Sequence, residues 1–80
     1  MSKISDEAYR IIQFLKAEYG SFPGSYILTE TLLPIYDDDE ARTNAAIDEL
    51  IKADFTVKNS SGDMIALTSD GVNYSPNVRA

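Results

Sequence analysis

The chain has no cysteine, no histidine and few cations, with seven lysines and arginines against thirteen aspartates and glutamates. Without cysteine, a disulfide framework and thiolate chemistry are excluded. Without either residue, the commonest zinc ligands and the commonest general base are also missing. The sequence has no glycine-rich phosphate loop and no nucleophile elbow. We therefore expect no enzyme, no cofactor and no metal site; a tyrosine–lysine or paired-carboxylate site is the remaining catalytic alternative.

Long apolar runs are absent as well. No run approaches the roughly 18 residues that span a bilayer, and residues 1–15 lack the apolar core of a signal peptide. We therefore expect a cytoplasmic protein with no membrane contact. The 80 residues, 44% hydrophobic and 25% charged, suit one small folded domain. We expect this domain to cover residues 1–74, with residues 75–80 as a disordered tail.

The first segment, from about Ser5 to Tyr19, has the apolar spacing of one helix face. Its stripe consists of Ile4, Ala8, Ile11, Ile12, Leu15 and Tyr19. Ser5 is the expected N-cap, and Asp6 and Glu7 follow in the first turn, where the helix dipole favours anions. Gly20 is the expected C-cap.

Residues 25–36 are ambiguous. Residues 25–28 suit either a short strand or a link. Thr29 can cap a short helix, which would contain Leu32, Leu33, Ile35 and Tyr36. Because Pro34 lies inside this helix and lacks an N–H, we expect the helix to be short or distorted.

A second strong helix is predicted from near Asp38 to near Ala53. Asp37 or Asp38 can cap it, and Asp37 with Glu40 has the spacing of a capping box. At about 100° per residue, Thr43, Ile47, Leu50 and Ile51 lie on one side. The other side carries Arg42, Ala45, Asp48, Glu49 and Lys52. Asp54 stands where a helix usually ends in glycine, and aspartate tolerates left-handed backbone.

The remaining residues predict a β-hairpin. Residues 55–58 alternate apolar and polar side chains, residues 59–62 form a turn cluster, and residues 64–67 return as a second strand. Residues 68–71 suit another turn or a single helical turn. These elements define an α+β, mainly helical domain; a helical bundle with an incidental hairpin is the alternative.

Residues 45–55 resemble winged helix-turn-helix proteins. In many small bacterial, archaeal and phage regulators of this superfamily, the recognition helix closes with leucine, two or three polar residues, glycine and an apolar residue. Leu50 and Phe55 hold the apolar positions here, and Asp54 replaces the glycine. Residues 67–71 resemble the frequent exit from the wing, Leu-Thr, two residues, Gly. The resemblance implies three helices followed by a C-terminal hairpin wing.

This resemblance implies a DNA-binding transcriptional regulator, whose recognition helix begins near Asp38. The outward N-terminal residues of such helices meet base edges, where arginine reads guanine and asparagine reads adenine. A lysine beside the wing tip could meet phosphate. The predicted DNA-binding residues are Arg42, Asn44, Ala45 and Lys58. The alternative is that Arg42 and Asn44 are ordinary solvent-facing residues.

The net charge of −6 and the run Asp37-Asp38-Asp39-Glu40 oppose DNA binding, because affinity for nucleic acid comes largely from neutralised phosphates. The four carboxylates either stabilise the helix start, or form an acidic patch for a protein partner, or belong to a surface that imitates DNA. A calcium site is a further option, but the required loop spacing is missing. The alternative function is therefore an acidic protein-interaction module that does not bind DNA.

The sequence is also compatible with a homodimer. Winged-helix proteins often dimerise through terminal helices, and Tyr9, Phe14 and Phe22 could supply exposed apolar area for such a contact. The alternative is that these rings complete a small core.

Overall fold

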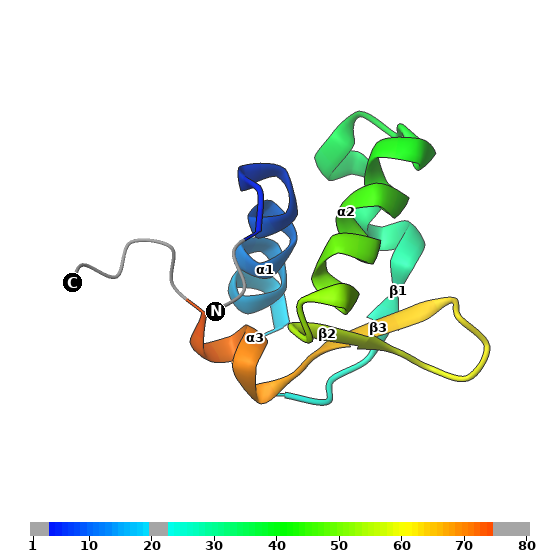
Figure 1. Ribbon diagram of the computed structural model, residues 1–80. Helices are drawn as coiled ribbons and strands as arrows, with labels where there is room; N and C mark the ends of the chain where they lie inside the picture. Colours follow the sequence, from blue (N-terminus) through cyan, green and yellow to red (C-terminus); the bar gives the residue numbers. More distant parts are fainter. Residues whose placement is uncertain (1–3, 20–22, 75–80) are drawn as a thin grey trace.

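The computed structural model describes residues 4–19 and 23–74, which form helices and a small sheet. In chain order the elements are α1 (Asp6–Tyr19), β1 (Ile27–Leu28), η1 (Thr29–Tyr36), α2 (Glu40–Lys52), β2 (Thr56–Lys58), β3 (Met64–Leu67) and α3 (Ser69–Asn73). The predicted α+β, mainly helical domain with a C-terminal hairpin is confirmed. Figure 1 shows α1 and α2 on one side of the sheet, with the hairpin extending beyond α2. The predicted C-cap Gly20, the ring of Phe22 and the expected tail 75–80 lie outside the described residues.

The opening helix follows its sequence signals. The Ala8 N–H donates to Ser5 Oγ at 3.2 Å, so Ser5 caps α1 as predicted. Ile4, Ala8, Ile11, Ile12 and Leu15 are all buried in the core. The start of α1 is tied to α2 by Glu49, whose carboxylate accepts from the Ser5 N–H at 2.6 Å and from Ser5 Oγ at 2.8 Å.

The middle helix is distorted, as Pro34 predicted. All eight residues of η1 form a 3₁₀ helix, and Pro34 inside it can donate no helical hydrogen bond. The prediction that Thr29 caps this helix was wrong. Thr29 is its first residue, and the Thr29 N–H donates instead to the Asp63 carbonyl at 2.9 Å, which extends the sheet pairing.

The start of α2 also differs from the prediction, which placed its cap at Asp37 or Asp38. The N-cap is Asp39, whose carboxylate accepts from the Arg42 N–H at 3.1 Å. Asp37 and Asp38 instead have φ values of 58° and 61° and form the left-handed turn that ends η1. Because Asp37 and Asp38 lie in this turn, neither residue is at the N-cap position of α2.

The end of α2 was predicted correctly. Asp54 has a φ of 64°, so it does occupy the left-handed position that glycine usually takes. The Asp54 N–H donates to the Ile51 carbonyl at 3.0 Å, and the Phe55 N–H donates to the Leu50 carbonyl at 2.9 Å. These two bonds form a Schellman motif, and Phe55 then enters the core.

The sheet has three antiparallel strands in the order β1-β3-β2. Residues 27–28 are therefore a strand and not a link. The expected alternation in β2 was wrong, because Thr56 is 1% exposed and Val57 is 42% exposed. Thr56 pairs with Leu67 on the helix-facing side of the sheet, whereas Val57 pairs with Ala66 on the opposite side. Phe55 enters the core before β2 begins. The buried and exposed positions of Thr56 and Val57 are therefore the reverse of those that hydrophobicity predicts.

The hairpin turn is closed by one side chain. Asn59 Oδ1 accepts from the Gly62 N–H at 2.9 Å and from the Met64 N–H at 3.1 Å, and its amide donates to Asp63. Gly62 takes the positive φ of 80° that this turn requires. After β3, Thr68 caps the single helical turn α3 by accepting from the Gly71 N–H.

Candidate functional site

Arg42, the first predicted base-reading residue, lies against α1 and not on the outward side of α2. Its guanidinium donates to the Glu7 carboxylate at 2.6 Å, and this ion pair raises the pKa of Arg42. The same guanidinium lies 5.5 Å from the ring centre of Tyr36. The Arg42 side chain is 41% exposed, and its Nη2 donates to a partner within the chain.

Tyr36 is the centre of this arrangement, at the place where α1, η1 and α2 meet. Its side chain is fully buried, and its hydroxyl donates to the Glu7 backbone carbonyl. Burial raises the pKa of Tyr36 to about 12. Arg10 also lies over the ring, 5.3 Å from its centre, and donates to the Ile35 carbonyl at 2.9 Å. The arginines therefore join three helices through one ring.

The sequence did not indicate this cluster. Glu7 and Arg42 are 35 residues apart, and neither position has a local pattern that would pair them. Tyr36 was expected in the short helix, but nothing in its neighbourhood predicted two cations over its ring. The interaction depends on how the helices pack.

The other predicted DNA-binding residues are exposed; Ala45 lies on the same side of α2 as Arg42, whereas Asn44 does not. Asn44 and Ala45 lie on the solvent side of α2, and Lys58 lies at the end of β2. Asn44 and Arg42 flank the buried Thr43, whose hydroxyl donates to the Asp39 carbonyl at 2.8 Å. Arg42 therefore faces α1, and Asn44 faces η1.

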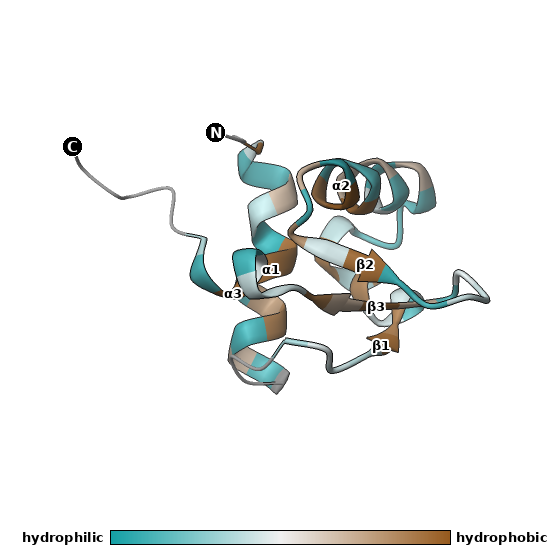
Figure 2. Cartoon of the chain, turned by 60° about the horizontal axis from the view of Figure 1, so that its bottom comes forward, coloured by the Kyte–Doolittle hydropathy of each residue, from teal (hydrophilic) through white to brown (hydrophobic). Residues whose placement is uncertain are grey.

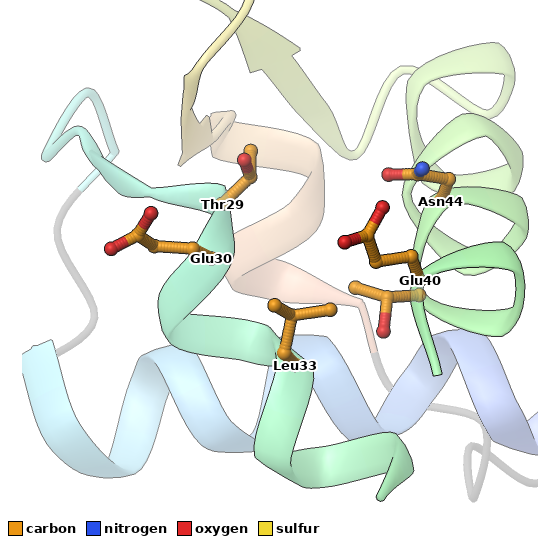
Figure 3. A pocket seen from close by; sticks show the side chains of 6 residues that line it. Thr29, Glu30, Leu33, Glu40 and Asn44 are labelled. Atoms are coloured by element: carbon orange, nitrogen blue, oxygen red, sulfur yellow. The ribbon is translucent and has the colours of Figure 1, made fainter. Parts of the chain in front are cut away.

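A shallow cleft of about 220 Å³ lies between η1 and α2. It is lined by Thr29, Glu30, Leu33, Glu40, Thr43 and Asn44. In Figure 3 the side chains of Glu40 and Asn44 extend from α2 toward η1, while the Glu30 carboxylate points to the other side of η1. The cleft thus presents a carboxylate, an amide and hydroxyls beside one leucine.

The surface around this cleft is strongly acidic. We call it the η1–α2 face, and define it by the exposed residues of η1, of the turn at 37–39 and of α2. From residue 29 to residue 52, all of which are described, the exposed acidic residues are Glu30, Asp37, Asp38, Asp39, Glu40 and Asp48. The cations in that range are Lys52, which is exposed at the far end of α2, and Arg42, whose side chain is 41% exposed and paired with Glu7. Within the predicted acidic run, Asp39 caps α2 and Glu40 lies in its first turn, where the helix dipole favours an anion, whereas Asp37 and Asp38 lie in the turn before the helix.

The aromatic residues suggested for a dimer contact lie against the core where they are described. Tyr9 and Phe14 are partly buried and pack on the core cluster. The ring of Tyr9 meets Tyr74 edge-on at 5.7 Å, and Tyr74 lies 4.6 Å from Phe55. These contacts attach α3 to α1, and they favour the core alternative for Tyr9 and Phe14.

Comparison with known proteins gives no match: no protein-family model, curated protein or solved structure is significantly similar to the chain. Within residues 4–19 and 23–74, no group of three or more side chains suited to hold a metal ion comes together. No helix in the same ranges combines the length and apolar character needed to cross a membrane.

Proposed function

We propose that the chain is a small protein-interaction module of winged-helix type, which binds a basic segment of a partner protein on its η1–α2 face. The observation that carries this proposal is the charge of that face, where six exposed carboxylates outnumber two cations, Lys52 and the Arg42 that pairs with Glu7. A potential of this sign attracts lysine and arginine and repels phosphate. The ion pair with Glu7 partly neutralises Arg42, the cation of this face best suited to nucleic acid.

The cleft between η1 and α2 gives the partner a specific anchor. A lysine or arginine side chain can lay its methylene groups against Leu33 while its charged end reaches the carboxylate of Glu40 and the amide oxygen of Asn44. Because each exposed ion pair contributes only about 0.2–1 kcal/mol, the partner segment needs several cations. The acidic turn at residues 37–39 lies next to the start of α2 and would meet the further lysine or arginine side chains of that segment.

DNA binding is the second candidate function. It is supported by the element order, with a hairpin directly after α2, and by the exposure of Asn44, Ala45 and Lys58. A regulator of this kind would place α2 in the major groove and the hairpin beside the phosphates. The carboxylates of the η1–α2 face oppose it.

The proposal is tested by fluorescence anisotropy with three labelled probes: a peptide of about 15 residues containing six arginines, an acidic peptide of equal length, and a duplex of about 25 base pairs. We expect the arginine peptide to bind and the other two to remain unbound at about 50 mM salt. Salt-sensitive binding of the duplex, without binding of the arginine peptide, would replace the proposal with the DNA function.

A matched pair of variants separates site binding from general attraction. Asp38→Asn with Glu40→Gln removes two charges from the η1–α2 face, and asparagine tolerates the left-handed backbone at residue 38. Glu18→Gln with Asp70→Asn removes two charges from exposed positions on α1 and α3. The first pair should weaken binding of the arginine peptide about fivefold more than the second. Equal weakening by both pairs would contradict the proposal.

A further inference from the structure

The cleft between η1 and α2 has room for one side chain. Its volume of about 220 Å³ is below the roughly 300–1,000 Å³ of pockets that hold whole small-molecule ligands. Leu33 supplies an apolar surface from η1. Thr43 is the buried member of the lining, and its hydroxyl already donates to the Asp39 carbonyl. The cleft therefore suits a single long side chain that brings its own hydrogen-bond donors.

Acceptors without a partner line the α2 side of this cleft. Glu40 and Asn44 are one helical turn apart, so their side chains are neighbours on α2, and both extend toward η1 (Figure 3). Within the part of the chain that the structure describes, neither the Glu40 carboxylate nor the Asn44 amide has a hydrogen-bond or ion-pair partner. Figure 2 shows hydrophilic and hydrophobic colours alternating around α2, and both residues are exposed. The cleft thus offers three acceptor oxygens from two adjacent side chains.

We infer that this cleft selects arginine over lysine, so that the basic partner anchors through one arginine side chain; the inference rests on the proposed function. A guanidinium carries five N–H donors in a fixed planar fork, whereas an ammonium carries three donors on one atom. The fork can form two parallel hydrogen bonds with the Glu40 carboxylate while another N–H reaches Asn44 Oδ1. The ammonium meets the same three oxygens from a single point, so it satisfies fewer of them.

Solvation favours the same choice. The cleft is shallow, so a bound cation exchanges only part of its water for protein oxygens. A guanidinium is more weakly hydrated than an ammonium and loses less on entering, and its methylene groups can lie on Leu33. The six lining residues, all of them described, include no aromatic ring. The cleft therefore lacks the aromatic cage that recognises methylated lysine.

Three labelled peptides of about 15 residues test the inference by fluorescence anisotropy. The first contains six lysines, the second has arginine in place of the central lysine, and the third has uncharged citrulline there. We expect the second peptide to bind about fivefold more tightly than the first, because the two have equal charge and differ by about one hydrogen bond in the cleft. The citrulline peptide should bind most weakly. Equal binding of the first two peptides would overturn the inference and leave the proposed function standing, whereas no binding by any peptide would overturn both.

Two alanine substitutions that keep the net charge locate the effect. Asn44→Ala removes an acceptor from the cleft, and Asn73→Ala removes the same side chain from an exposed position on α3. Both positions are exposed in helices, where alanine is the best helix former, so both variants should fold. Asn44→Ala should reduce the preference for the arginine peptide about threefold, and Asn73→Ala should leave it intact. An undiminished preference in Asn44→Ala, or an equal reduction in both variants, would overturn the inference, because arginine would then be favoured without the cleft.

Discussion

Replacing Gly71 by alanine probes how closely α3 is fitted against the start of the hairpin. A Cβ atom at this position would lie 2.1 Å from the Phe55 carbonyl oxygen and 3.1 Å from Leu67 Cδ2. Non-bonded heavy atoms prefer separations near 3.5–4.0 Å. Because the obstacle is backbone and not the end of a flexible side chain, either α3 or the Phe55 peptide must move.

The magnitude follows from three contributions. Overpacking of a tight site costs about 1–3 kcal/mol. The displaced Phe55 carbonyl accepts from the Thr68 N–H at 3.0 Å, and loss of that hydrogen bond costs about 0.5–1.5 kcal/mol. The better helix propensity of alanine returns at most about 1 kcal/mol. The net loss of unfolding free energy is therefore about 2 kcal/mol, which lowers Tm by roughly 8–16 °C in a domain of this size.

Thermal unfolding followed by far-UV circular dichroism measures this loss, with Asn73→Ala as the control. Asn73 is exposed on the same helix and makes one hydrogen bond, from its amide to the Ser69 carbonyl at 3.0 Å. We expect it to lower Tm by no more than about 4 °C. If Gly71→Ala unfolds within about 2 °C of the wild type, or if the two variants lose equal stability, the reasoning about a close approach is refuted.

Three further substitutions test other parts of the structure. Asp54→Gly should raise the free energy of unfolding by about 0.5–1 kcal/mol in urea titrations, because glycine relieves the left-handed backbone at φ 64°; a loss of stability would contradict the Schellman assignment. Thr56→Val should stabilise by about 1 kcal/mol, since Thr56 Oγ1 is buried without a hydrogen-bond partner. Thr43→Val should destabilise by a similar amount, since it removes the bond to Asp39, and the same sign for both valine variants would refute the comparison. Burial raises the pKa of Tyr36 from 10.0 to about 12, so the folded chain holds this proton more tightly than the unfolded chain. The stability linked to this proton should be complete below pH 10 and lost as the pH rises toward 12, and Tyr36→Phe should reduce that loss; an unchanged pH profile would argue against the buried hydroxyl.

Several elements could be predicted because their signals are local. The stripe of α1, its Ser5 cap and the left-handed end of α2 at Asp54 each depend on residues within one or two helical turns. The distortion of η1 was likewise predicted from Pro34, since a missing N–H removes a hydrogen bond within its own turn. The Leu-Thr-x-x-Gly pattern also corresponds to a local interaction, because the Gly71 N–H donates to the Thr68 hydroxyl that caps α3.

The inward position of Thr56 and the outward position of Val57 could not be predicted. Hydrophobicity favours the opposite arrangement, but register is set by pairing with β3 and by the turn at Asp54, which sends Phe55 into the core first. The choice of Asp39 as the cap had a similar origin. Asp37 and Asp38 were equally good caps in sequence, but the end of η1 required them in a left-handed turn.

Composition alone established that the chain carries no cysteine or histidine chemistry and a charge of −6, and short-range apolar spacing established where its helices and hairpin lie. Tertiary packing decided which charges reach solvent. It brought Glu7 to Arg42 across 35 residues, so the guanidinium that also interacts with Asp37 and Asp39 is paired with α1, whereas Lys52 at the end of α2 stays exposed. It also placed Leu28 and Val57, from two edge strands, on one face of the sheet. The physical reason is that backbone propensity acts over a few residues, whereas ion pairing and burial depend on side chains brought together through space.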